Sequence, residues 1–445
     1  MQTLQIERRS AAARLDRLPI GSYHRRIMWL LGFVFFSELG GINTFSFAAP
    51  AIMKVWHLSI STVSLLVSAT FIGMFVGATT GGWFSDRLGR KRALILTTCW
   101  FSGFSLLNAF VWGPAGLFLT RLLTGVGLSA MTVVGITYVS EMFPATKRGA
   151  YQGWIMTIGL MGIPVTAYVA RFTIPIAEWG WRLVFVWGAL GLLFPLFANS
   201  IDESPRWYES HGQLAEADAV LDRIEVRARA EFGELPPAPE SVATPSRRGG
   251  YKELLARPYR ARTLMLISAW ICQTLGFYGF TAWVPTLLVA HGFSMVNSLA
   301  WSSAISIGAV PGALIAALIS DRWERKWSIT IAALVIAFCG LMYGTTFKTV
   351  TIITFGFLVA MFIQTFAPLL YAYTAECYPT EIRNSGTGLG YGLGRLSNAF
   401  GPLVVAYLYT NHGYTSVFVY IATMWLMVAI IIGSLGPLTK GRTLE

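Results

Sequence analysis

Three charged side chains of this sequence lie deep inside long apolar runs, where charges are rare. Glu38, Arg121 and Arg395 each sit in a run of roughly 20 or more mostly apolar residues, long enough to cross a bilayer as a helix. A charge near the bilayer centre costs roughly 2.5–3.5 kcal/mol on insertion scales, so it is retained for a reason. Of the 22 Asp and Glu residues only Glu38 is placed in this way, and none of the five histidines is. Glu38 is therefore our candidate for a side chain that takes up and releases a proton.

Depth along the helices indicates a partner for Glu38. A rise of about 1.5 Å per residue places Glu38 roughly 16 Å, and Arg121 roughly 20 Å, from the membrane face on which the N-terminus lies. We therefore expect Arg121 to pair with the carboxylate, to keep it ionised, and to be released when it is protonated. The alternative interpretation is a static buried pair that only fixes helix packing.

Arg395 has no carboxylate left to pair with inside the apolar runs. It follows alternating glycines over 386–394, which we interpret as a small-residue packing face rather than a nucleotide-binding loop. A guanidinium can hold a carboxylate through two parallel hydrogen bonds, so an anionic ligand would supply the partner. We expect Gln273, Tyr278 and Tyr371 to complete this pocket. The alternative is an arginine that extends along the bundle to water or to backbone carbonyls.

The elements that must position these residues are membrane-spanning helices. The chain has 445 residues, of which 54% are hydrophobic and only 13% are charged, whereas soluble domains have about 25% charged residues. Backbone groups in lipid must pair internally, so the apolar runs must be helical. We predict an all-α polytopic membrane protein with twelve spans: 27–52, 60–84, 93–113, 115–141, 150–176, 180–201, 263–290, 297–319, 327–346, 349–375, 385–410 and 414–436.

Basic residues are distributed unequally between the two sides of these spans. Most of the 34 Lys and Arg residues fall in the N-terminal segment, the central segment and the loops after the second and eighth spans. The opposite side has only Lys54, Arg171, Arg182 and Lys348. Because cytoplasmic loops are enriched in Lys and Arg, we expect a cell (inner) membrane protein with both termini in the cytoplasm. The same bias explains the net charge of +12 without a nucleic acid partner.

The polar segment between the sixth and seventh spans divides the chain in two. Its residues 213–230 have one apolar stripe and are predicted to form an amphipathic helix. We therefore expect an N-terminal cytoplasmic segment, a six-helix bundle, a central cytoplasmic loop, a second six-helix bundle and a cytoplasmic tail: 1–26, 27–201, 202–262, 263–436 and 437–445, respectively.

No residue cluster indicates catalysis or a bound cofactor. The cysteines Cys99, Cys272, Cys339 and Cys377 lie in or beside apolar runs, at spacings without a metal-site pattern. No nucleophile–base pair is apparent either. We expect a protein that is not an enzyme, that holds no metal or cofactor, and that acts as a monomer on a small-molecule ligand and protons within membrane lipid.

The two halves repeat each other. Asp-Arg-x-Gly-Arg-Lys at 86–91 recurs as Asp-Arg-x-Glu-Arg-Lys at 321–326. Glu-x-x-Pro-x-x-x-Arg at 141–148 recurs at 376–383. Each motif stands at the same place in its half, so the halves are expected to share one fold. Repeated halves around a site at mid-membrane are typical of transporters.

These motifs resemble those of the major facilitator superfamily, over essentially the whole chain. Its signature loop is similar to residues 82–91, and its sugar-porter and metabolite:proton symporter branches have stretches similar to three others: Arg121-x-x-x-Gly125-x-Gly127, Glu141-x-x-Pro144-x-x-x-Arg148-Gly149 and Glu203-Ser204-Pro205-Arg206-Trp207. The resemblance implies two six-helix bundles related by pseudo-two-fold symmetry around a central cavity. It implies a secondary active transporter, and we predict proton symport of a small organic anion, such as an aromatic carboxylate. The alternatives are a sugar or polyol carrier and a drug exporter.

The resemblance also implies a role for the charged residues of the repeated motifs. Opposite charges at the cytoplasmic ends of the spans would form charge-assisted pairs that hold the two bundles together and act as a gate. The alternative is solvated loop charge that only sets topology. The gate residues are Asp86, Arg90, Glu141, Arg148, Asp321, Arg325, Glu376 and Arg383.

The first span departs from the pattern of the related acid symporters. Those proteins tend to have Asp-x-x-Asp ahead of a proline in the first span. Counted back from Pro50, Glu38 falls on the first acid and Gly41 on the second, so one of the two acids is missing.

The chain also lacks most of the amides with which sugar porters bind hydroxyl groups. Aligned on the shared motifs, Met156 stands for the glutamine of the fifth span. In the seventh span Gln273 is kept, but Cys272 and Tyr278 stand for a glutamine and an asparagine, and Tyr371 stands for the tryptophan of the tenth span. An organic anion is therefore favoured over a hexose.

Overall fold

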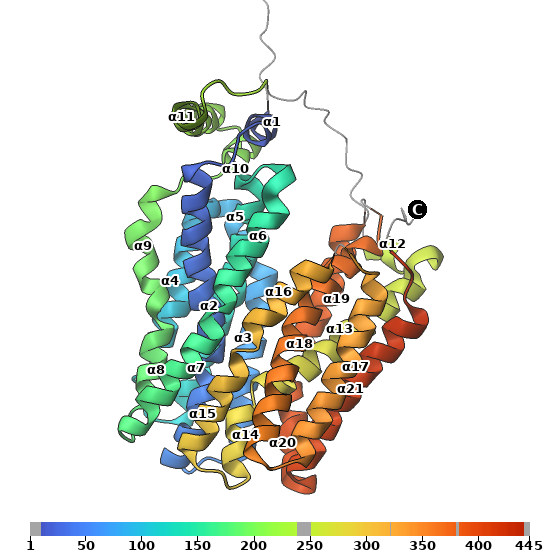
Figure 1. The fold of residues 1–445 in the computed structure, drawn as a ribbon. Helices are drawn as coiled ribbons and strands as arrows, with labels where there is room; N and C mark the ends of the chain where they lie inside the picture. The colour runs from blue at the N-terminus through green and yellow to red at the C-terminus, as the bar shows by residue number, and fades with distance from the viewer. Residues whose placement is uncertain (1–9, 238–250, 321, 380–381, 440–445) are drawn as a thin grey trace, which may run out of the picture.

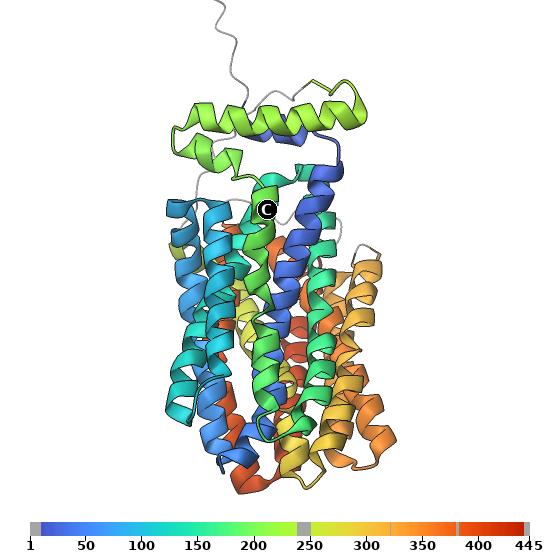
Figure 2. The ribbon, with the colours of Figure 1, turned by 90° about the vertical axis from the view of Figure 1, so that its left-hand side faces the viewer.

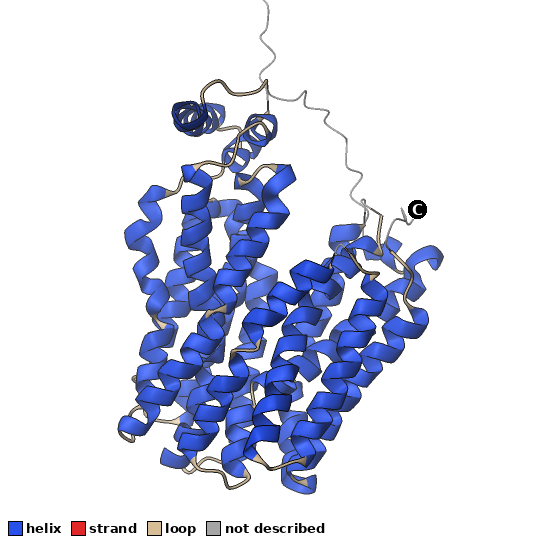
Figure 3. Cartoon of the chain, in the orientation of Figure 1, coloured by secondary structure: helices blue, strands red, loops and turns tan. Residues whose placement is uncertain are grey.

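The structure is a computed structural model that describes residues 10–237, 251–320, 322–379 and 382–439. Within these ranges all regular secondary structure is helical (Figure 3). The described helices reproduce the twelve predicted spans, arranged side by side as two groups of six (Figure 1).

The first six spans form the N-terminal half. Four of them are single helices, whereas the fifth and sixth are interrupted. The single helices are α2 (Ser22–Val55), α3 (Ile60–Leu88), α4 (Arg90–Asn108) and α5 (Pro114–Met142). The fifth span comprises α6 (Ala145–Leu160), α7 (Gly162–Thr173) and η1 (Ile174–Ile176), and the sixth comprises α8 (Trp181–Gly188), η2 (Leu190–Leu193), α9 (Phe194–Phe197) and η3 (Ala198–Ser200).

The last six spans form the C-terminal half, in which three spans are interrupted. The interrupted spans are α13 (Arg257–Thr281) with α14 (Val284–Ala290), α15 (Met295–Ser306) with α16 (Ala309–Ile319), and α19 (Arg383–Ser397) with α20 (Gly401–His412). The single helices are α17 (Arg325–Thr345), α18 (Thr349–Glu376) and α21 (Tyr414–Leu435).

Ten helices or helix runs in the described part of the chain are long and apolar enough to cross a membrane. The other two predicted spans fall short for physical reasons. Helix α4 begins with three consecutive basic residues, Arg90, Lys91 and Arg92, and the eleventh span is interrupted at 398–400, between α19 and α20. Both of these spans still lie side by side with the other spans (Figures 1 and 2).

Glycines bring the helices of the N-terminal half into close contact. Helices α3 and α5 pack along their length. A Cβ atom at Gly73, Gly77 or Gly125 would collide with a backbone carbonyl oxygen of the facing helix. Small residues at a helix contact allow backbones to approach closely, which is how membrane helices gain packing energy in lipid.

The two halves contact each other at one end of the molecule. There α7 packs on α15, α2 on α14, and α3 on α20. The hydroxyl of Ser303 in α15 donates a hydrogen bond to the carbonyl of Ala167 in α7 (3.1 Å). Toward the opposite end the two groups of helices diverge (Figure 1).

Three short helices cover the diverging end of the N-terminal half. They are α1 (Ala11–Asp16), α10 (Pro205–Ser210) and α11 (Leu214–Phe232), and α11 lies across the ends of the spans (Figure 2). Helix α11 corresponds to the predicted amphipathic helix. It buries a stripe of apolar residues that ends at Ile224. A fourth short helix, α12 (Tyr251–Leu254), precedes α13.

Ion pairs fasten α1 to α11. Glu225 accepts hydrogen bonds from Arg14 Nε and Arg17 Nη2, both at 2.8 Å, and Arg14 Nη2 reaches Asp222 at 2.6 Å. Burial alone would raise the pKa of Glu225, but the hydrogen bonds from the two arginines outweigh it and hold that pKa below its ordinary value. The N-terminal segment is thus attached to the central segment across some 200 residues of sequence.

Candidate functional site

Arg395 is the centre of a polar cluster at the level where the halves meet. Its Nε and Nη2 donate hydrogen bonds to the hydroxyl of Tyr391 (2.9 and 2.5 Å), and its Nη1 donates to the hydroxyl of Tyr278 (3.0 Å). Nη1 also lies 3.7 Å from the sulfur of Met74, in α3 of the other half. The side chain is half-buried. The Nε–Nη2 edge, which a carboxylate would bind with both oxygens, is therefore held by one phenol oxygen.

Aromatic rings surround this guanidinium. The indole of Trp270 lies edge-on to the rings of Tyr371 and Tyr391, with centroid separations of 4.8 and 5.6 Å. The ring of Tyr278 lies 4.6 Å from that of Phe71 in the N-terminal half. Tyr371 remains 41% exposed. The cluster therefore provides flat apolar walls beside a fixed positive charge.

The glycine run of α19 positions Arg395. A Cβ at Gly390 would press on Trp270, and one at Gly394 would press on Thr274 and the backbone of Trp270. These glycines therefore let α19 lie directly against α13, as predicted for a packing face. The side chain of Arg395 then extends from α19 toward Tyr278 rather than into that contact.

Gln273 has a different neighbour from the one we expected. The structure brings Tyr278 and Tyr371 next to Arg395, but the carbonyl oxygen of the buried Gln273 side chain accepts a hydrogen bond from the hydroxyl of Thr274 (3.1 Å). No hydrogen bond between Gln273 and Arg395 is found among the described residues. Its place in the binding pocket stays a prediction.

Glu38 lies opposite this cluster, in α2. Its carboxylate is 3% exposed and accepts a hydrogen bond from the hydroxyl of Thr132 in α5 (2.9 Å). Arg395 is the cation whose charge acts on this carboxylate. A buried acid from one half and a half-buried cation from the other therefore share one electrostatic environment.

The expected ion pair between Glu38 and Arg121 is not formed in this structure. Arg121 lies over the ring of Phe45 (5.0 Å), two helical turns beyond Glu38 in α2. Thr132, which does contact Glu38, is 11 residues further along α5, or roughly 16 Å of helix. The depth argument failed because it measured Arg121 against a core of about 30 Å, whereas α5 (Pro114–Met142) is longer than that. Arg121 lies roughly 32 Å from the Met142 end of α5, and Glu38 lies roughly 24 Å from the start of α2 at Ser22.

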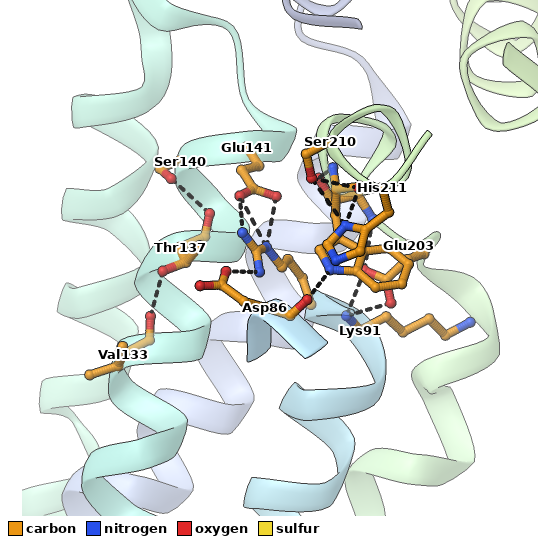
Figure 4. A network of polar contacts seen from close by, with 12 residues as sticks. Asp86, Lys91, Val133, Thr137, Ser140, Glu141, Glu203, Ser210 and His211 are labelled. Atoms are coloured by element: carbon orange, nitrogen blue, oxygen red, sulfur yellow. Dashed lines mark hydrogen bonds and ion pairs between the residues drawn. The ribbon is translucent and has the colours of Figure 1, made fainter. Parts of the chain in front are cut away.

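The charged motif of the N-terminal half forms a network within that half (Figure 4). Arg90 donates to Asp86 (2.6 Å) and, through Nε and Nη2, to Glu141 (2.9–3.1 Å). The carboxylate of Glu203 accepts from the backbone N–H of Lys91 (2.9 and 3.0 Å) at the start of α4. This is a favourable place for a negative charge, because the first amides of a helix lack partners.

The signature glycine of this motif is required by the backbone. Gly89 has φ +92°, in the region that favours glycine, and a Cβ there would collide with the carboxylate of Glu203. The indole N–H of Trp207 adds a hydrogen bond to the carbonyl of Asp86 (2.6 Å). The motif thus joins the loop after α3 to α10, one of the cap helices α1, α10 and α11 that cover the end of the N-terminal half.

The counterparts in the C-terminal half are also paired locally. Arg325 lies 2.7 Å from Glu376, and Arg383 Nε donates to the carbonyl of Tyr378 (3.4 Å). Arg148 is half-buried at the start of α6, and Asp321 lies outside the described residues. The ion pairs of the motifs described here therefore join helices of one half, and the gate between the halves stays a prediction.

Sequence reasoning missed four residues of this cluster: Met74, Thr132, Trp270 and Tyr391. Helical spacing could have identified two of them. Tyr391 precedes Arg395 by four residues, and Trp270 precedes Tyr278 by eight, so each pair shares a helix face. Met74 and Thr132 are uncharged residues of apolar spans in the other half, and the sequence has no signal that marks them.

Residues 27–445 match the family described as "Sugar (and other) transporter". The metabolite transport protein YyaJ of Bacillus subtilis is 45% identical over 97% of this chain and 96% of its own length. The niacin transporter NiaP of Acinetobacter baylyi is 29% identical over 97% of this chain and 98% of its own. A gallate transporter of Pseudomonas putida is 29% identical over 88% of this chain and 86% of its own.

A solved structure has the same fold. The crystal structure of a D-xylose–proton symporter superposes with a TM-score of 0.74 over 95% of this chain and all of that chain, at 20% sequence identity.

Proposed function

We propose that this chain, which belongs to the sugar (and other) transporter family of the major facilitator superfamily, carries a small aromatic carboxylate across the membrane together with a proton. Membership of the family makes it a multi-pass membrane transporter of small organic substrates rather than an enzyme. The aromatic carboxylate and the proton are the parts that we infer.

The observation that carries the substrate assignment is a guanidinium enclosed by aromatic rings. A carboxylate would take the place of the Tyr391 hydroxyl on the Nε–Nη2 edge of Arg395 and accept two charge-assisted hydrogen bonds. Its ring would then lie against Trp270 and Tyr371. The names of two relatives support this class, since niacin and gallate are both aromatic carboxylic acids.

A neutral sugar has no comparable anchor in the cluster. Gln273, the amide shared with sugar porters, has its carbonyl turned to Thr274. A bound sugar would also leave the charge of Arg395 uncompensated in a half-buried site. The likeness to the D-xylose symporter concerns the fold alone.

Glu38 is the proposed proton carrier. Burial favours the neutral form of Glu38, and the positive charge of Arg395 in the empty site opposes this by favouring the ionised carboxylate. Once a substrate carboxylate neutralises that charge, the buried Glu38 is accommodated better in its protonated form. Substrate and proton would therefore bind together, and the loaded site would have one cation, one anion and a neutral acid. Arg121 has no part in this step, because it does not reach Glu38.

The orientation follows from the charge bias. We infer that the termini, the cap helices and the diverging end of the spans face the cytoplasm, so the structure has its contact between the halves at the outer end. When the halves close at the cytoplasmic end, the Arg90 and Arg325 clusters would come to face each other as the gate. One chain supplies every group of the site, so a monomer suffices.

Uptake by the purified protein in liposomes tests the substrate class. We expect labelled nicotinate, in an inward proton gradient, to enter faster than nicotinamide or D-xylose, and Arg395→Ala to lose this uptake. Arg171→Ala, which changes an arginine lying over Tyr168 and Phe172, is the control and should transport normally. If the wild type prefers the amide or the sugar, or if Arg395→Ala carries nicotinate normally, the proposal is wrong.

A further inference from the structure

Arg121 is a buried cation without a counter-ion. Its side chain is 3% exposed, and its Nε and Nη1 atoms are buried without a hydrogen-bond partner among the described residues. Its one charge-related contact in this part of the chain is with the ring of Phe45 (5.0 Å). Such a contact contributes less than the several kcal/mol that a buried charge requires. The missing partner must therefore come from outside the described residues.

Among the residues that the structure describes, no acid acts on Arg121. Along the face of α5 that contacts α2, Leu128 lies opposite Gly41, and Thr132 opposite Glu38. Glu38 is thus engaged roughly 16 Å away along the helix. Next to Arg121 on α5, Thr124 receives a hydrogen bond from the buried amide of Asn108 (3.2 Å). The neighbourhood is polar but carries no negative charge.

Arg121 lies nearer than Arg395 to the end at which the halves make contact, and Met74 of α3 lies near both. A Cβ at Gly125 would lie 3.0 Å from the backbone nitrogen of Met74, and the sulfur of Met74 lies 3.7 Å from Nη1 of Arg395. Arg121 precedes Gly125 by four residues in α5. It therefore lies roughly 6 Å closer than Gly125 to the end at which the halves make contact. An anion that approaches from that end would reach Arg121 before Arg395.

We propose that Arg121 is a second anion-binding site, which holds a small monovalent anion near the outer end of the N-terminal half. The chemistry is shared by two sources, an inorganic anion such as chloride and the carboxylate of the substrate on its way to Arg395. The carboxylate source rests on the function proposed above, and the chloride source does not. The site is new in that its charge comes from α5, whereas the substrate site is built on α19.

Thermal unfolding of the purified full-length protein tests the chloride source. Sodium chloride replaces the sodium salt of a bulky sulfonate, 2-morpholinoethanesulfonate, at constant ionic strength, because a ligand that binds the folded state raises the unfolding temperature. We expect the wild type to be stabilised and Arg121→Gln to lose this response. Arg182→Gln is the matched control: Arg182 lies at the same end, over Trp112 and Trp181, and donates to a backbone carbonyl, so the response should remain.

Sodium benzoate, added in the same sulfonate salt, tests the carboxylate source. In the Arg395→Ala variant, benzoate should still stabilise the protein by binding at Arg121. In the double variant with Arg121→Gln this stabilisation should be lost, because the affinity for benzoate should fall roughly ten- to a hundredfold. Loss of either the chloride or the benzoate response on Arg121→Gln supports the proposal and identifies the source. If neither response depends on Arg121, it is a packing residue and the proposal is overturned. If the wild type binds no aromatic acid, the proposed function fails, yet the chloride arm still decides on Arg121.

Discussion

Replacing Glu38 by glutamine should uncouple transport from protons without disturbing the fold. Glutamine has the shape and neutral charge of a protonated glutamate, and its carbonyl can still accept the hydrogen bond from Thr132 (2.9 Å). The substitution removes a potential negative charge from a site that is only 3% exposed. We therefore expect normal insertion and folding, and a carrier that stays fixed in its proton-loaded form.

The size of the effect follows from the number of carboxylates. Glu38 is the only acid well inside a described span, so one proton is expected to move with each substrate. One proton with one monovalent acid carries no net charge, so the membrane potential contributes nothing. A gradient of one pH unit should then drive about tenfold accumulation, because one unit corresponds to about 1.4 kcal/mol. For Glu38→Gln the ratio should remain near one.

Liposomes loaded with buffer at two pH values provide the assay. Wild type and Glu38→Gln are compared for accumulation in the gradient, and for exchange of labelled against unlabelled acid without one. Protein-free liposomes measure passive permeation of the acid. We expect Glu38→Gln to keep the exchange and lose the accumulation. Tenfold accumulation by Glu38→Gln would refute the reasoning, and a ratio near one hundred in the wild type would require a second proton carrier.

Three further substitutions test other parts of the structure. Tyr391→Phe removes the hydroxyl that occupies the Nε–Nη2 edge of Arg395, so calorimetry should show roughly two- to tenfold tighter binding of the aromatic acid. Weaker binding would mean that the hydroxyl contacts the substrate. Gly77→Ala inserts a methyl group against a backbone carbonyl and should destabilise the protein by roughly 1–3 kcal/mol, whereas Gly82→Ala meets open space; equal melting temperatures would contradict the packing argument. Hydrogen bonds from Arg14 and Arg17 lower the pKa of Glu225. The ion pairs that attach α1 to α11 should therefore stabilise the fold fully above pH about 4.3 and be lost as the pH falls below that value. Glu225→Gln should release α1 already at pH 7, as faster amide hydrogen exchange, and unchanged exchange would show that the pairing is dispensable.

The spans and the cap helix could be predicted because they depend on composition and period. Long apolar runs and the stripe at 213–230 are local signals, and the structure confirms them to within a few residues. The sequence did not predict that the seventh, eighth and eleventh spans would be interrupted. Their breaks fall at 282–283, 307–308 and 398–400, where the sequence remains largely apolar or small. Hydropathy does not detect such a break, because the break removes backbone hydrogen bonds without changing the apolar composition of the span.

The candidate site was only partly predictable for a related reason. Glu38 and Arg395 stand out because charge is rare in apolar runs, and Tyr278 lies next to Arg395 as expected. The partner of Glu38 depends on the register between α2 and α5, which is fixed by close packing such as that of Phe35 against Gly135. Tyr391 was overlooked because its glycine-rich neighbourhood was interpreted only as a packing surface.

The two halves share motifs, yet their first two spans differ in how easily they bend. The first two spans, α2 and α3, are unbroken, whereas their repeats in the C-terminal half are divided into α13 with α14 and α15 with α16. Bending an intact helix strains every hydrogen bond along it, while a break already lacks some of these bonds and bends more easily. The spans α2, which carries Glu38, and α3 would therefore bend less than their counterparts in the C-terminal half. Occlusion of the substrate would then need only local bending at the breaks of the seventh and eighth spans.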